Sequence, residues 1–252
     1  MKRYTFLLLI IGLIISNNSY CQIACSGGRY LNEIFPTVNT TSNILYGNNI
    51  NVGGNSEDLF LDIYEPMGDT AALRPLIILA HGGSFVGGDK VDGCADVMCK
   101  DLTKLGYVTA SINYRMGFQD FPPFCPDSDK ATETVWRATH DARASVRFFK
   151  QDSISNLYRI DTSLIFFGGQ SAGAFMALHL AYVDEVSEIP VDTSKPGLGG
   201  GIEGNSGTPG YSSKVTAIIN MAGALGDTAW MKAGDTPIIS FHGDQDGTVP
   251  FD

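Results

Sequence analysis

Basic residues are scarce in this sequence: 17 lysines and arginines stand against 27 aspartates and glutamates, which gives a formal net charge of −10. A chain this acidic is not expected to bind nucleic acid, although the charge by itself identifies no substrate. Beyond its first fifteen residues the sequence also has no apolar run long enough to cross a bilayer. These two absences exclude nucleic-acid-binding proteins and proteins that span the membrane several times.

The first 21 residues have the pattern of a signal peptide. A short basic lead precedes an apolar run over 6–15 that is too short for a comfortable membrane span. The small residues Ser19 and Cys21 then stand three positions and one position before a cut at Gln22. We therefore predict a signal peptide over 1–21 and an exported protein, periplasmic or extracellular.

Cysteines are few, and none of them forms a C-x-x-C pair. Four would remain after cleavage: Cys25, Cys94, Cys99 and Cys125. An even number in an exported protein permits two disulfides, with three possible connectivities, and we expect Cys94, Cys99 and Cys125 to be oxidised at least in part. A metal site is the weaker interpretation because the four histidines do not cluster with the cysteines in the sequence.

Strand-like and helix-like segments alternate along residues 22–252, which form one domain of about 230 residues. Period-two alternation predicts an outer, antiparallel strand over 59–66, after a polar, turn-rich stretch over 43–55. A continuous apolar run over 75–80 is typical of a central parallel strand with helices on both faces. Further strands are predicted over 107–114, 164–167, 215–221 and 237–241, and helices over 90–105, 131–151 and 172–182. The alternation predicts an α/β fold with a doubly wound, mainly parallel sheet.

A glycine-rich stretch over 195–211 separates the last predicted helix from the strand over 215–221. Gly199, Gly201 and Gly204 formally match a dinucleotide-binding fingerprint. The match is discounted because it neither follows a strand nor opens a helix, and glycine density alone explains it. We predict no cofactor, and interpret the stretch as a mobile loop over the edge of the sheet that carries the site.

A serine stands where the strand over 164–167 breaks into glycines and the helix over 172–182 begins. The pattern is Gly169-Gln170-Ser171-Ala172-Gly173. Small flanking residues tolerate the tight turn, called a nucleophile elbow, that holds a serine hydroxyl clear of the sheet. A bare G-x-S-x-G can arise by chance in a chain with 29 glycines, but strand, serine turn and helix seldom arrive together. Ser171 is therefore the candidate nucleophile.

The sequence His81-Gly82-Gly83-Ser84 directly follows the central strand over 75–80. Glycines at such a position let backbone N–H groups turn toward a developing oxyanion, and the N–H of Ala172 can supply another donor. The alternative is an ordinary strand-to-loop turn with glycine for steric reasons. The serine elbow some 90 residues later favours the oxyanion hole.

A third group of candidates lies in the stretch 241–250, again after an apolar strand. Asp246 is in a turn-rich loop at the carboxyl end of that strand, where doubly wound sheets gather their catalytic groups. Asp244 is its competitor. His242 adjoins the strand end and is interpreted as structural. The remaining histidines are interpreted as structural too: His81, which braces its own loop, and His140 and His179, which lie on predicted helices.

With these motifs the chain resembles the α/β-hydrolase superfamily, and within it the bacterial carboxylesterases that carry an HGG oxyanion motif. The resemblance covers essentially the whole predicted domain. It implies the α/β-hydrolase fold, Ser171 of G-x-S-x-G as nucleophile and Asp246 of H-G-x-x-D-x-x-V-P as the acid of the triad. It also implies an oxyanion hole built from the backbone N–H groups of Gly83, Ser84 and Ala172. Ser84 stands where the commoner HGGG form has its third glycine, a change that keeps the N–H.

The base is the main departure from that superfamily. Its chain order is serine, acid and then histidine, yet no histidine follows Asp246 in this sequence, whose last residue is Asp252. We expect on this ground that the sequence is a fragment, with its catalytic histidine beyond residue 252 and its sheet truncated before the final strand. A catalytically crippled product is the alternative.

Together these features predict an exported serine hydrolase that cleaves a carboxylic ester through an acyl-enzyme intermediate. The expected partner is a small-molecule or polysaccharide-linked ester, with no nucleic acid, no membrane contact after signal cleavage and no metal. A serine peptidase of the same fold is one alternative, although the substrate-gating domain that such peptidases normally carry is not found in the sequence. The other is a non-catalytic α/β-hydrolase-like binding protein, which only the missing histidine favours.

Overall fold

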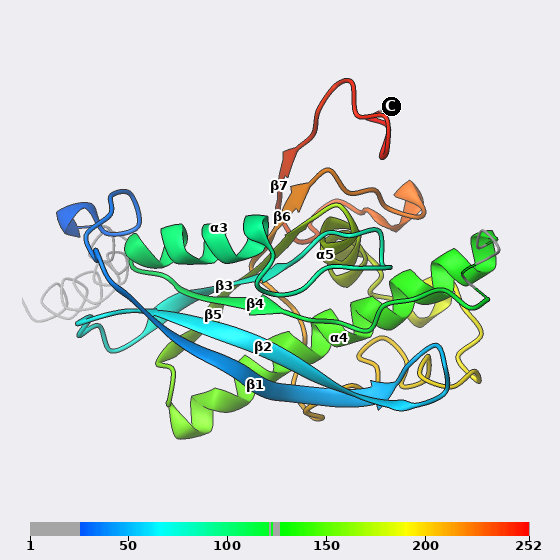
Figure 1. Cartoon of the computed structure of the whole chain (residues 1–252), viewed down its shortest axis with the longest axis horizontal. Helices are drawn as coiled ribbons and strands as arrows, with labels where there is room; N and C mark the ends of the chain where they lie inside the picture. The colour runs from blue at the N-terminus through cyan, green and yellow to red at the C-terminus, as the bar shows by residue number, and fades with distance from the viewer. Residues whose placement is uncertain (1–25, 121, 123–126, 252) are drawn as a thin grey trace, which may run out of the picture.

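The computed structural model describes residues 26–120, 122 and 127–251 (Figure 1). The predicted signal peptide and its cleavage site, together with Cys25 and Cys125, lie outside the described residues. Within the described part, no helix is both long and apolar enough to cross a membrane.

Seven strands of the described chain form one sheet, in the spatial order β1-β2-β4-β3-β5-β6-β7. Their bounds are β1 (Val38–Ile50), β2 (Ser56–Pro66), β3 (Arg74–Ala80), β4 (Val108–Ile112), β5 (Ile160–Gln170), β6 (Ala217–Met221) and β7 (Ile238–Phe241). β2 pairs antiparallel with β1 and with β4, whereas all neighbours from β4 to β7 are parallel. The predicted mainly parallel sheet with an antiparallel start is confirmed.

Helices cover both faces of this sheet (Figure 1). Helix α3 (Gly93–Lys104) lies on one face, while α4 (Ser128–Ser155) and α5 (Ala172–Tyr182) lie on the other. The central strand β3 contributes to a hydrophobic cluster on each side, with Leu76 and Ile78 in the cluster of α4 and α5 and with Ile77 and Leu79 in the cluster of α3. Burial on both faces explains why this strand reads as a continuous apolar run.

The helices follow the sequence pattern closely. Helix α5 has the predicted bounds, 172–182. Helix α4 is longer than the predicted 131–151, because the Asp127 side chain accepts from the Lys130 N–H at 2.9 Å and caps an earlier start. It ends at Ser155, because the next residue, Asn156, has a left-handed backbone at φ 51 that stops the helix.

The prediction for the start of the sheet is wrong in one respect. The polar stretch over 43–55 is not a loop, since most of it belongs to β1, and β1 rather than β2 is the outer strand. Most side chains of β1 are exposed or half-buried, and Tyr46 is the one that the structure buries fully. An edge strand of this kind is held by main-chain pairing with its neighbour, so its sequence does not need apolar alternation.

Buried arginines hold the glycine-rich stretch over 195–211 against α4. Arg115 donates to the Gly197 carbonyl at 3.1 Å and forms a fully buried ion pair with Asp141 of α4. Arg147 of α4 donates to the carbonyl oxygens of Glu203, Ser206 and Thr208. None of the residues of this stretch lines the cavity beside Ser171, so the stretch forms no wall of that cavity.

The expected oxidation of Cys94 and Cys99 is wrong as well, since both are free thiols. Cys99 lies on the buried face of α3, and burial raises the pKa of its thiol to about 12. Cys94 is exposed at the start of the same helix. A thiol held in its neutral form inside the core is inert toward disulfide formation.

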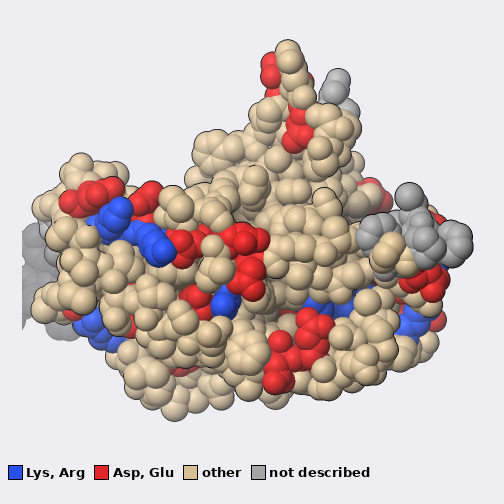
Figure 2. Space-filling view, in the orientation of Figure 1, with Lys and Arg blue, Asp and Glu red and all other residues tan. Residues whose placement is uncertain are grey.

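Acidic side chains gather in several groups on the face seen in Figure 2, whereas basic side chains are few and scattered. This distribution matches the net charge of −10. On this face the described residues form no continuous basic patch of the kind that nucleic acid requires.

Candidate active site

Ser171 occupies the tight turn between β5 and α5. Its backbone is at φ 51 and ψ −117, a positive-φ conformation that residues other than glycine rarely adopt. The turn is held on both sides, since the Ser171 N–H donates to the Met221 carbonyl at 2.8 Å and the Ser171 carbonyl accepts from the N–H groups of Ala174 and Phe175. The hydroxyl forms no cap on α5, so it stays available for chemistry.

The two glycines that flank the serine are required by close backbone contacts. A Cβ on Gly169 would lie 2.4 Å from the carbonyl carbon of Gly173, and a Cβ on Gly173 would lie 2.2 Å from the carbonyl oxygen of Ala80. Real Cβ atoms do not approach backbone this closely. The G-x-S-x-G spacing is therefore a steric requirement of the turn between β5 and α5 as it packs on β3.

The loop after β3 is strained in a similar way, because Gly83, Ser84 and Phe85 follow one another at φ 119, 52 and 59. The loop lies directly beside the serine turn: a Cβ on Gly82 would be 3.5 Å from the Cβ of Ser171. This contact joins the two motifs that the sequence separates by some 90 residues.

Three backbone N–H groups near the serine have no hydrogen-bond acceptor among the described residues. They belong to Gly83, Ser84 and Ala172. Ala172 is the first residue of α5, where the N–H groups lack helical partners and the helix dipole favours negative charge. Such donors are what a developing oxyanion needs.

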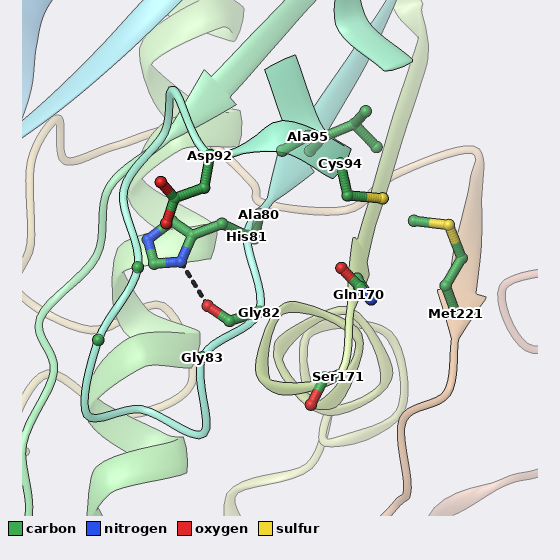
Figure 3. Close-up of a pocket in the computed structure, with 13 residues that line it drawn as sticks. Ala80, His81, Gly82, Gly83, Asp92, Cys94, Ala95, Gln170, Ser171 and Met221 are labelled. Carbon is green, nitrogen blue, oxygen red and sulfur yellow. Dashed lines mark hydrogen bonds between the residues drawn. The ribbon is translucent and has the colours of Figure 1, made fainter. Parts of the chain in front are cut away.

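A cavity of about 600 Å³ opens beside Ser171 (Figure 3). Five elements line it, namely the end of β3, the loop after it, the start of α3, the serine turn and the end of β6. The lining residues are Leu79, Ala80, His81, Gly82, Gly83, Gly87, Gly88, Asp92, Cys94, Ala95, Gln170, Ser171 and Met221. None of these described residues is a lysine or an arginine, so they offer no cationic side chain of that kind to an anionic ligand.

His81 is buried at the wall of the cavity and bonds to its own loop. Its Nδ1 lies 2.6 Å from the Gly82 carbonyl oxygen, which can only accept, so Nδ1 carries the proton. Burial lowers the pKa of His81, which keeps the ring neutral. The Tyr114 ring stacks on it with centroids 4.5 Å apart, and the Tyr114 hydroxyl donates to the His81 carbonyl at 2.9 Å.

Asp246 is fixed by the turn that carries it, after β7. Its Oδ1 accepts from the N–H groups of Val249 at 3.0 Å and Thr248 at 2.8 Å, and these two bonds lower the pKa of the carboxyl. Its Oδ2 lies 3.7 Å from Nε2 of His242, which itself bonds to the Val249 carbonyl at 2.7 Å. Asp244 is exposed and has no such anchor among the described residues, so the structure distinguishes the two aspartates.

The structure thus brings together part of the predicted site. Ser171 and Gly83 line one cavity, and Ser84 and Ala172 follow them directly in the chain. Asp246 does not line this cavity. In the described part of the chain no hydrogen bond joins the Ser171 side chain to a histidine. Two of the histidines lie inside helices, where burial lowers the pKa to about 3 for His140 and to about 4 for His179.

The residues at the site that were not predicted from the sequence include Asp92, Cys94, Tyr114 and Met221. Tyr114 lies two positions beyond the end of β4, a place that could have drawn attention to it. The other three have no signal in the sequence, because they reach the cavity only through the packing of α3 and β6 beside the serine turn.

Comparisons with known proteins identify solved structures with a similar fold. The solved structures that this chain resembles include a bifunctional GH43-CE protein of Bacteroides eggerthii, esterase 2 of Thermogutta terrifontis phosphorylated by paraoxon, and a truncated carbohydrate esterase from gut microbiota. The TM-scores are 0.61, 0.58 and 0.60, at 22%, 22% and 21% sequence identity. The matches cover 84%, 86% and 87% of this chain. The fold is accordingly that of the α/β hydrolases.

The chain spans only 29% of the length of the bifunctional protein, against 74% and 81% of the other two. The family model described as BD-FAE matches residues 61–233, more than half of the chain. The chain therefore belongs to the BD-FAE family, a family of α/β-hydrolase-type esterases. A comparison with curated proteins finds no match.

Proposed function

We propose that this protein is a carboxylic ester hydrolase that uses Ser171 as its nucleophile. The single observation that carries the proposal is the state of Ser171: a strained backbone at φ 51 holds an uncapped hydroxyl at the edge of a cavity. Membership of an esterase family supports the reaction class. The solved structure of the Thermogutta esterase with its paraoxon-derived phosphoryl group supports the same chemistry, because organophosphates modify activated serines.

In the proposed reaction Ser171 Oγ attacks the carbonyl carbon of the ester, and the carbonyl oxygen becomes an oxyanion. The N–H groups of Gly83, Ser84 and Ala172 stabilise this oxyanion, each contributing about 3 kcal/mol as in other oxyanion holes. A general base takes the Ser171 proton and returns it to the ester oxygen as the C–O bond breaks, so the alcohol leaves and an acyl group remains on Ser171. Water then gives a proton to the same base and attacks the acyl carbonyl, and the same donors stabilise the second oxyanion. The bond from the acyl carbon to Ser171 Oγ breaks, Oγ takes the proton back from the base, and the carboxylic acid leaves.

Asp246 is proposed as the acid that orients the base. Its anchoring by two backbone N–H groups and its lowered pKa support a carboxylate that stays ionised. The base is proposed to be a histidine other than the four in residues 1–252. His242 bonds to Val249, His81 bonds to Gly82, and the other two are buried in helices.

The proposed substrate is a neutral ester, either a small molecule or an ester linked to a polysaccharide. Two of the similar structures support the second possibility, since one is named a carbohydrate esterase and the other carries a CE part beside GH43. The described residues of the cavity lining include no lysine or arginine, which agrees with a neutral acyl group. We further propose that the protein is exported, with its mature chain beginning at Gln22.

The test is turnover of short-chain aryl esters by the full-length protein. Ser171→Ala should lower turnover by about 10⁴-fold to 10⁶-fold while the fold stays intact, because only one hydroxyl is lost. Ser153→Ala, at an exposed position near the end of α4, is the matched control and should retain full activity. Wild-type turnover in Ser171→Ala would refute this nucleophile, and a full-length protein that hydrolyses no ester would favour a binding function.

A further inference from the structure

Tyr114 is joined to the candidate oxyanion loop by two contacts. Its hydroxyl donates to the His81 carbonyl at 2.9 Å, and its ring stacks on the His81 imidazole at an interplanar angle of 22°. The side chain is only 2% exposed. Burial raises the pKa of Tyr114, so its hydroxyl remains a protonated donor throughout the working pH range of an esterase.

His81, held in this way by Tyr114, in turn holds the peptide between Gly82 and Gly83. Its Nδ1–H donates to the Gly82 carbonyl, and the Gly82 carbonyl oxygen and the Gly83 N–H belong to the same planar, trans peptide. In such a peptide the C=O and N–H point in opposite directions. Figure 3 shows the Gly82 carbonyl facing the His81 ring. Holding the carbonyl toward His81 therefore turns the Gly83 N–H away from His81.

This peptide needs such a restraint because it lies between two glycines. Without side chains, rotation about the flanking φ and ψ bonds costs little. Within the described residues the Gly82 carbonyl accepts no hydrogen bond other than the one from His81. The ring itself is confined, since a Cβ on Gly88 would lie 2.3 Å from His81 Nδ1. Tyr114 and Gly88 thus enclose the imidazole that sets the direction of the Gly83 N–H.

We propose that Tyr114 is a positioning residue for the oxyanion hole, acting through His81 on the Gly82–Gly83 peptide. The inference rests on the proposed function, because it assigns a role within the same reaction. Tyr114 is almost fully buried and does not line the cavity beside Ser171, so we assign it no contact with the reacting atoms. Its hydroxyl fixes the His81 carbonyl and its ring fixes the imidazole, so that the Gly83 donor is already aimed when the oxyanion forms.

The experiment compares Tyr114→Phe with Tyr46→Phe in the full-length protein. Tyr46 is a matched control, because it too is buried and its hydroxyl donates to a backbone carbonyl, that of Asn113, at 2.5 Å. Each variant loses one buried hydrogen bond and keeps its ring. The readouts are kcat and KM for a short-chain aryl ester, the affinity for an alkyl boronic acid that mimics the tetrahedral intermediate, and Tm.

Tyr114→Phe should lower kcat by about tenfold with KM changed less than twofold, and should weaken boronic acid binding by the same factor as kcat/KM. Tyr46→Phe should keep both activity and boronic acid affinity. His81→Phe, which keeps the stacked ring, should reproduce the loss, and adding Tyr114→Phe to it should cost less than twofold more, because both act on one peptide.

Equal losses of Tm in the two tyrosine variants with unchanged kcat and boronic acid affinity would overturn the positioning role and leave the proposed function standing. Additive effects of His81→Phe and Tyr114→Phe would also overturn it. A wild-type protein that neither hydrolyses esters nor reacts with a fluorophosphonate would overturn the proposed function, and the role of Tyr114 with it.

Discussion

Gly173 lies so close to the end of β3 that a Cβ at this position would be 2.2 Å from the carbonyl oxygen of Ala80. The contact joins the first turn of α5 to β3, the strand that leads into the oxyanion loop. The serine turn and that loop can lie this close only because residue 173 is a glycine and has no side chain.

The first prediction is that Gly173→Ala destabilises the protein by about 3 kcal/mol or more, because neither backbone element can move aside. Gly93→Ala is the control: it opens α3, and its Cβ would meet nothing within 4 Å. That variant should be neutral or slightly stabilised, since alanine favours helix over glycine. Urea unfolding measures both, and equal midpoints for the two variants would contradict the steric account.

The second prediction concerns the buried pair of Arg115 and Asp141, both of which are fully shielded from solvent. Asp141→Asn should cost about 3–5 kcal/mol, because it leaves the Arg115 guanidinium buried without a counter-charge. Asp101→Asn, which breaks the exposed pair with Lys104, should cost about 1 kcal/mol or less. A loss in Asp141→Asn no larger than that in Asp101→Asn would show that the pair does not hold the 195–211 stretch against α4.

The third prediction is a loss of stability in mild acid. Burial lowers the folded-state pKa of His140 to about 3 and of His179 to about 4, below the ordinary value near 6.5 that applies in the unfolded chain. The contribution of the two neutral histidines to the free energy of unfolding is therefore complete above pH 6.5. It is lost as the pH falls toward their folded-state pKa values. Between pH 6.5 and pH 5 each of these histidines should lower the free energy of unfolding by about 2 kcal/mol.

Urea unfolding of wild type and His140→Gln at pH 7.5 and pH 5 measures this effect. The glutamine cannot titrate, so the stability gap between the two proteins should shrink by about 2 kcal/mol at the lower pH. A gap that is the same at both pH values would mean that His140 is not held neutral.

The fourth prediction separates the two aspartates after β7. Asp246→Asn should lower ester turnover in the full-length protein by about 10⁴-fold, as expected when a triad acid becomes an amide. The asparagine carbonyl still accepts from the N–H groups of Thr248 and Val249, so the turn should survive. Asp244→Asn, at an exposed position, should leave turnover unchanged. The reverse pattern would transfer the role to Asp244.

Local features of this protein could be predicted from its sequence. The serine turn combines a buried strand, close-packed glycines and a helix in one continuous segment, so its pattern is complete without the rest of the chain. The bounds of α5 follow for the same reason. By contrast β1 carries few buried side chains, and its place in the sheet depends on main-chain pairing that leaves little trace in the residues.

Contacts between distant segments could not be predicted. His81 and Tyr114 are 33 residues apart and meet because β3 and β4 are parallel neighbours in which Ala80 pairs with Ile112. Chain order alone does not give that pairing. The position of the 195–211 stretch likewise depends on Arg115 and Arg147, which donate hydrogen bonds to its backbone carbonyl oxygens. The periodicity of apolar residues does not show which loop a buried arginine will bind.

The most direct test of the account is the reaction of the full-length protein with a fluorophosphonate, followed by peptide mass spectrometry. We predict one adduct, located on Ser171, that is absent from Ser171→Ala and retained in Ser153→Ala. An adduct on another residue, or ester hydrolysis that continues while Ser171 remains unmodified, would contradict the assignment of Ser171 as the nucleophile.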